Sequence, residues 1–153
     1  MTRPQVLPDD IKTAQAAGIT TIISLLEQQE AEQVGLRDEP ATCATNGITF
    51  RNHPIRDMHL PEPAAFTAFA KAIATRIYNG EHIALHCHAS IGRSGMLTCA
   101  ILAHFGYDAE GALTHTTQMR GTQIPDTPEQ AAFIHRIMDA NVSSSAPAVL
   151  AEE

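Results

Sequence analysis

Apolar runs alternate with polar connections rich in glycine and proline along the chain, and this alternation predicts a succession of strands and helices. Residues 19–26 read Ile-Thr-Thr-Ile-Ile-Ser-Leu-Leu, which is typical of a strand buried on both faces of a sheet. We expect a second strand over residues 48–53, ended by Pro54, and a short buried strand over residues 83–85.

The remaining pattern is helical. Phe66, Phe69, Ile73 and Ile77 recur at the spacing of one helix face, on a helix that ends before Gly80. The Thr127–Gln130 segment has the form of a capping box and begins the last helix. We expect a first helix that Asp9 or Asp10 caps and that stops at Gly18. Three more helices are expected over residues 27–33, 40–46 and 95–105. Another begins after Asp108 as its cap and ends at Gly121.

Strands that alternate with helices indicate an α/β fold. We therefore predict a single domain with a central, mostly parallel sheet flanked by helices. The chain has 153 residues, which is the size of one ordinary domain. We expect residues 1–141 to form this domain and residues 142–153 to be a disordered tail.

Composition narrows the class of protein. Apolar residues make up 44% of the chain and charged residues 18%, which is globular composition, and the formal net charge is -7. An acidic chain disfavours nucleic acid as a partner, and no apolar run approaches the roughly 18 residues of a membrane span. The N-terminus has no secretory h-region, and three scattered cysteines suggest a reducing compartment. We expect a cytoplasmic monomer with no nucleic-acid or membrane partner.

The segment that indicates chemistry is His86-Cys87-His88-Ala89-Ser90-Ile91-Gly92-Arg93-Ser94, between a predicted strand and a predicted helix. Ligands of open α/β sheets bind at the carboxyl ends of strands, and the free N–H groups of such a turn and of the helix after it converge on an anion. We expect the backbone of residues 88–92 and the Arg93 fork to bind phosphate oxygens.

Cys87 lies at the floor of this predicted anion site. A helix N-terminus and a nearby arginine stabilise a thiolate, so the loop combines a nucleophile with a phosphate cradle. Ser94 is placed to donate a hydrogen bond to the sulfur and to favour its departure in a second step. The features taken one by one have structural explanations, but their joint pattern in a strand–loop–helix context indicates a catalytic site.

The His-Cys-x5-Arg-Ser pattern resembles the signature loop of the cysteine-based protein tyrosine phosphatases, and the short chain is similar to their small dual-specificity branch. Other segments similar to the kinase-associated phosphatase type lie at residues 22–26, 54–57 and 119–130. Ser90 departs from the pattern, since many members have glycine there. The resemblance implies hydrolysis of phosphomonoesters through a cysteinyl-phosphate, most of all protein phosphotyrosine but also phosphoserine or phosphothreonine. It implies no cofactor and no metal, and a phosphorylated protein or small phosphoester as the substrate.

The same resemblance suggests further roles. Asp57, 30 residues before Cys87 in a proline-shaped loop, matches the general acid of the family, and Glu62 is the reserve candidate. Gln130 is similar to a glutamine that handles water in classical members, although the capping box also explains it. We expect His86 to orient the loop.

Other interpretations remain open. A phosphate-binding module without catalysis needs Arg93 alone, and a rhodanese-like sulfurtransferase needs the Cys87 loop but no Asp57. A zinc site at residues 86–88 is a weaker alternative, because adjacent residues do not easily reach one tetrahedral ion. Neither the preferred phosphoester nor a redox role for Cys43 or Cys99 follows from the sequence.

Overall fold

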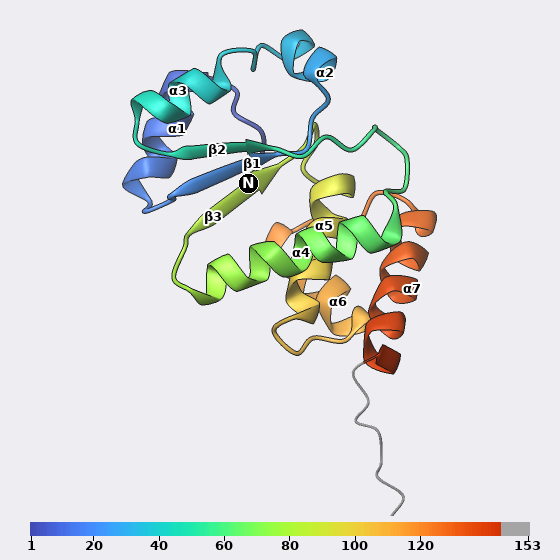
Figure 1. The fold of residues 1–153 in the computed structure, drawn as a ribbon. Helices are drawn as coiled ribbons and strands as arrows, with labels where there is room; N and C mark the ends of the chain where they lie inside the picture. The colour runs from blue at the N-terminus through green and yellow to red at the C-terminus, as the bar shows by residue number, and fades with distance from the viewer. Residues whose placement is uncertain (145–153) are drawn as a thin grey trace, which may run out of the picture.

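Three parallel strands form the centre of the fold, and the computed structural model describes residues 1–144 (Figure 1). The strands are β1 (Thr21–Ser24), β2 (Thr49–Asn52) and β3 (Ile83–His86), in the spatial order β2-β1-β3. Because the strands are parallel and in register, with Ser24 opposite Asn52 and His86, their carboxyl ends meet at one edge of the sheet.

Helices cover both faces of this sheet, so the predicted α/β architecture is confirmed. Figure 1 shows α1 and α3 on one face and α4 to α7 on the other. The helices are α1 (Leu7–Ala16), α2 (Gln28–Gln33), α3 (Glu39–Thr45), α4 (Pro63–Tyr78), α5 (Gly92–Ala103), α6 (Ala109–Arg120) and α7 (Pro128–Ser144). None of the described helices is long and apolar enough to cross a bilayer.

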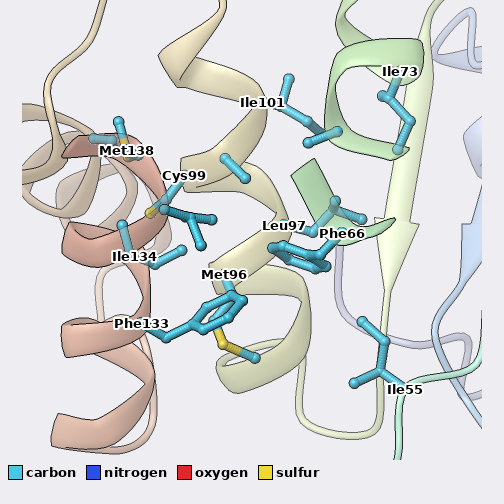
Figure 2. Packing of buried hydrophobic residues seen from close by; sticks show 14 of the residues in the cluster. Ile55, Phe66, Ile73, Met96, Leu97, Cys99, Ile101, Phe133, Ile134 and Met138 are labelled. Carbon is cyan, nitrogen blue, oxygen red and sulfur yellow. The ribbon is translucent and has the colours of Figure 1, made fainter. Parts of the chain in front are cut away.

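The larger hydrophobic core fixes α5, the helix that follows the candidate loop. Met96 and Leu97 of α5 are fully buried and lie among Phe66 of α4 and Phe133 of α7 (Figure 2). The rings of Phe66 and Phe133 meet edge to face with their centroids 5.5 Å apart, a favoured geometry for aromatic pairs. A helix wedged in this way presents its N-terminus at a fixed position.

The strand predictions hold for β1, which is buried at all four positions. The predicted burial of the third strand is wrong, because β3 lies at the edge of the sheet and Ile83, Ala84 and Leu85 are only half-buried. An apolar run of three residues does not distinguish a central strand from an edge strand with one covered face.

Two predicted helix starts also need correction. Neither Asp9 nor Asp10 is the N-cap of α1, which begins at Leu7 after Val6. Instead the Asp10 carboxylate reaches back from the first turn and accepts a hydrogen bond from the Val6 N–H at 2.9 Å. Helix α5 begins at Gly92, three residues earlier than predicted, and this places Arg93 in its first turn.

The start of α7 matches the prediction, because Thr127 and Gln130 form the reciprocal hydrogen bonds of a capping box, at 3.2 and 3.3 Å. The helix continues to Ser144, so residues 142–144 of the predicted tail are helical. No glycine or proline follows Pro128 before Pro147, and without such a stop signal a helix continues. The rest of the predicted tail lies outside the described residues.

Candidate active site

The candidate loop connects the end of β3 to the start of α5, at the sheet edge where the strand ends meet. Cys87 directly follows β3 and is 2% exposed, and its Sγ lies 3.3 Å from Oγ of Ser94 in the first turn of α5. Gly92 opens the helix, and a Cβ there would lie only 2.9 Å from the Gln130 side chain. A Cβ at this position would displace the end of the Gln130 side chain, so the close approach of α7 to the loop favours glycine here.

Arg93 is a buried guanidinium held by two other segments of the chain, helix α2 and the loop after β2. Its Nη1 donates to Glu30 Oε2 at 2.8 Å and to the Ile55 carbonyl at 2.9 Å. Its Nη2 donates to Glu30 Oε1 at 2.9 Å and lies 3.1 Å from Asp57 Oδ1. Glu30 binds the two terminal nitrogens, Nη1 and Nη2. The side edge of the guanidinium, formed by Nε and Nη2, is therefore where an anion can bind.

Glu30, on helix α2, is a partner that the sequence did not reveal. Its Oε2 also accepts a hydrogen bond from the Glu27 N–H at 3.0 Å, as the distal residue of a capping box. Burial opposes ionisation of Glu30, but the hydrogen bonds from Arg93 outweigh it and lower the pKa of the carboxyl. The capping-box spacing of Glu27 and Glu30 was the only local signal, and it indicated a structural role.

Asp57 lies in the loop after β2, where its carboxylate contacts Arg93 and is 59% exposed. The structure therefore brings the predicted general acid beside the predicted anion site while leaving it open to solvent. Glu62, the reserve candidate, has another role. Both of its oxygens accept N–H groups at the start of α4, from Ala64 at 3.0 Å and Ala65 at 2.7 Å, and these bonds lower its pKa.

His86 is fully buried under the loop and pairs with a second carboxylate that the sequence did not reveal. Its Nε2 lies 2.9 Å from Oε1 of Glu39, which is 1% exposed, and its Nδ1 lies 3.4 Å from the Cys87 carbonyl. Glu39 belongs to helix α3, which covers the face of the sheet opposite to α5 (Figure 1). His86 therefore links α3 to the backbone of Cys87. This contact fits the orienting role expected of His86.

Gln130 is both a capping residue and a neighbour of the loop. Its Oε1 accepts the N–H groups of Asp126 at 3.1 Å and Thr127 at 3.3 Å. Its Nε2 and the Asp126 carboxylate face Gly92, where a Cβ would lie 2.9 Å and 3.1 Å from them. The carboxamide nitrogen therefore lies at the loop while its oxygen accepts N–H groups at the start of the helix. No sequence pattern singled out Asp126.

Two further arginines hold the loop from outside. Arg3 donates to the His88 carbonyl, and Arg120 donates to the Ser90 carbonyl at 3.2 Å. His88 and Ala89 are exposed, whereas Ser90 is buried. Arg3 and Arg120 therefore add positive charge beside the loop even though the whole chain is acidic, which favours an anionic ligand there.

The cluster combines a thiol, a guanidinium, a carboxylate and a hydroxyl around one loop at a helix N-terminus. This set can attack an electrophile, bind its anionic oxygens and protonate a leaving group, which are the requirements of displacement at a phosphate ester. Within the described residues, no group of three or more His, Cys, Asp and Glu side chains has the arrangement of a metal site.

Known proteins are similar to this chain in sequence and in fold. A family profile described as "Tc-R-P: Polymorphic toxin system, DSP-PTPase phosphatase" matches residues 2–107, well over half of the chain. Cyclin-dependent kinase inhibitor 3 of Rattus norvegicus is 24% identical over 95 residues. That alignment covers 61% of this chain and 45% of the relative, so the chain spans less than half the length of this curated relative.

Solved structures show the same fold at low sequence identity. Kinase associated phosphatase, crystallised with its catalytic cysteine substituted by serine, has a TM-score of 0.80 at 20% identity, covering 89% of this chain and 78% of that one. Tk-PTP in its active form has a TM-score of 0.73 at 21% identity over 86% of both chains. Human DUSP28 has a TM-score of 0.68 at 18% identity, covering 88% of this chain and 87% of that one.

Proposed function

The chain belongs to the Tc-R-P family, the DSP-PTPase phosphatases of polymorphic toxin systems, and we propose that it hydrolyses phosphomonoesters of proteins through a cysteinyl-phosphate. The observation that supports this most is the meeting of Cys87, Arg93 and Asp57 at the carboxyl ends of the strands. Arg93 shares the first turn of α5 with Ser94, the neighbour of the Cys87 sulfur, and it contacts the Asp57 carboxylate.

In the first step the Cys87 thiolate attacks phosphorus and the bond to the ester oxygen breaks. The phosphoryl oxygens bind the N–H groups of residues 88–92 and the Nε and Nη2 edge of Arg93, where they displace the Asp57 carboxylate from Nη2. Released from Arg93, the Asp57 carboxylate takes up a proton from solvent, lies beside the departing oxygen and donates this proton to it. Charge that develops on the phosphoryl group is stabilised by fixed donors rather than by water.

In the second step water attacks the phosphorus of the cysteinyl-phosphate, and the P–S bond breaks. Asp57, now ionised, accepts the proton of this water. Ser94, 3.3 Å from the sulfur, donates a hydrogen bond to the leaving thiolate. The Gln130 carboxamide lies beside Gly92 and supports the position of the water.

We place phosphotyrosine first among the substrates, with phosphoserine and phosphothreonine tolerated. His88, Ala89 and Asp57 are all exposed around the loop, so the rim does not enclose the phosphate tightly. An open rim admits side chains of different length. We also propose a cytoplasmic location, because the three cysteines are free, and no nucleic-acid partner, because the net charge is -7. A monomer is part of the same proposal.

Release of p-nitrophenol from p-nitrophenyl phosphate tests the proposal. The wild type should turn the substrate over, and Cys87→Ser should be inactive while keeping the same circular dichroism and melting temperature. A wild type no faster than Cys87→Ser would leave only a phosphate-binding module. Phosphotyrosine and phosphoserine peptides of the same sequence, compared by kcat/KM, then establish the preference, and a higher value for phosphoserine would refute the order proposed here.

A further inference from the structure

Next to the loop lies a cavity whose apolar walls have no role in the phosphatase mechanism. It has a volume of about 700 Å³ and lies between the open edge of β3 and helices α5 and α6. Its walls are mostly apolar and include Ile77, Ile83, Leu85, Leu102, Phe105 and Met119. Phe105 is 43% exposed and Met119 is 74% exposed, so apolar surface extends to the mouth of the cavity. The size and the lining are those of a site for a small ligand.

One end of the cavity is polar and incompletely satisfied. Ser90 and Arg120 are among the residues that line this end, and Ser90 Oγ and Arg120 Nε are both buried without a hydrogen-bond partner among the residues that the structure describes. The two atoms belong to neighbouring side chains, because Arg120 Nη2 donates to the Ser90 carbonyl. Arg120 also has no salt bridge within the described part of the chain. Buried polar atoms in native proteins are normally paired, so this end is missing an acceptor.

Ser90 adds a second observation. It is 3% exposed and has a φ of +58°, a left-handed conformation that glycine adopts without cost. A serine there bears backbone strain and also buries an unpaired hydroxyl, two costs that persist only where the surroundings or a function impose them. Relative to glycine, serine adds a hydroxyl group at this position, and Ser90 is one of the residues that line the cavity.

We propose that this cavity binds an amphiphile with an apolar chain and an anionic carboxylate head. The head accepts hydrogen bonds from Arg120 Nε and Ser90 Oγ, and the chain lies along β3 and α5 toward Met119. The positive charge of Arg120 selects an anion over a neutral head group. The cavity adjoins the phosphate site, because Ser90 and Ser94 of the loop and of the first turn of α5 line it, but Cys87, Arg93 and Asp57 are not among its lining residues.

A peptide strand added to the edge of β3 fits these observations less well. The Leu85 carbonyl on that edge already accepts a hydrogen bond from the Met1 amine at 3.0 Å. An added strand would satisfy backbone groups, whereas the unpaired groups here are side-chain donors at one end of an apolar cavity.

Isothermal titration of the full chain with dodecanoate and with dodecanol tests this proposal. Dodecanoate should bind one to one. Arg120→Gln should weaken dodecanoate about tenfold or more, as expected for the loss of a charge-assisted hydrogen bond, and should leave dodecanol unchanged. Arg37→Gln, on an exposed turn, is the matched control and should bind like the wild type. Leu102→Trp should fill the apolar part and abolish binding of both probes.

Saturating orthovanadate separates this cavity from the phosphate site, and dodecanoate should bind equally in its presence. Displacement by orthovanadate would place the carboxylate at the catalytic loop and overturn the proposal. Absence of binding, or equal binding by Arg120→Gln and wild type, would also overturn it. If the chain binds no dodecanoate but forms a dimer that Met119→Glu dissociates, the cavity is instead the contact surface for a second copy of the chain. Each variant is first checked for an unchanged melting temperature, and binding is scored independently of phosphatase activity.

Discussion

The ion pair between Glu30 and Arg93 gives the sharpest test of how the site is held. Glu30→Gln keeps the shape of the side chain and one oxygen acceptor, but it removes the charge and one of two charge-assisted hydrogen bonds. Arg93 is 2% exposed and the Glu30 side chain 18%, so solvent replaces little of what is lost. A hydrogen bond to a charged group contributes about 1.5–3 kcal/mol, and we expect the free energy of unfolding to fall by about that amount.

The same loss should appear in catalysis, because Glu30 holds the end of the Arg93 fork and leaves the other edge to the phosphate. If the full 1.5–3 kcal/mol is expressed in the transition state, kcat/KM for p-nitrophenyl phosphate falls about 10- to 150-fold. Urea unfolding and steady-state kinetics measure the two quantities on the same samples. Glu32→Gln, an exposed residue of the same helix, is the control and should change neither.

The stability difference between wild type and Glu30→Gln should depend on pH in a defined direction. The pKa of Glu30 is lowered in the folded protein from a usual value of 4.5, because hydrogen bonds from Arg93 outweigh the effect of burial. The ion pair therefore stabilises the fold fully above pH 4.5 and stops doing so as the pH falls through the lowered pKa. Wild type and Glu30→Gln should differ in stability at neutral pH and converge in acid. A difference that is constant with pH, or normal kinetics in Glu30→Gln, would refute the reasoning.

Three other predictions concern the reacting groups. Asp57→Asn should lower kcat by about 10²- to 10⁴-fold for an alkyl phosphate and much less for p-nitrophenyl phosphate; equal losses would deny it the role of acid. Ser94→Ala should slow the second step, so that rapid mixing shows a burst of p-nitrophenol, and a linear trace would contradict this. Burial raises the pKa of Cys43 and of Cys99 to about 11, so iodoacetamide at pH 7, followed by peptide mass spectrometry, should modify Cys87 first.

The sequence predicted the parts of this protein that depend on local pattern. The alternation of apolar runs fixed the order of strands and helices, and the Thr127–Gln130 spacing located the start of α7. Cys87, Arg93 and Ser94 are close in the chain, so their proximity in space follows from the loop itself. Asp57 was placed through family resemblance rather than through spacing.

The partners from distant segments could not be predicted. Glu30 meets Arg93 across 63 residues and Glu39 meets His86 across 47. Both carboxylates lie in short polar helices, where glutamate is ordinary, and only the three-dimensional fold gives them a buried cation to pair with. The edge position of β3 was missed for the same kind of reason, since strand order is a property of the sheet and not of one strand.

These distances along the chain also bear on how activity arises during folding. The guanidinium of Arg93 is fixed by groups 63 and 38 residues earlier, and both of those loops have to close before the fork is aligned. Closing long loops costs conformational entropy, which only the packing of the finished core offsets. The contacts of Arg93 with Glu30 and Ile55 therefore form late. A partly folded chain has the Cys87 loop without an aligned arginine. Phosphatase activity should therefore recover only with the last phase of refolding. For the same reason, a chain that is still being synthesised should be inactive.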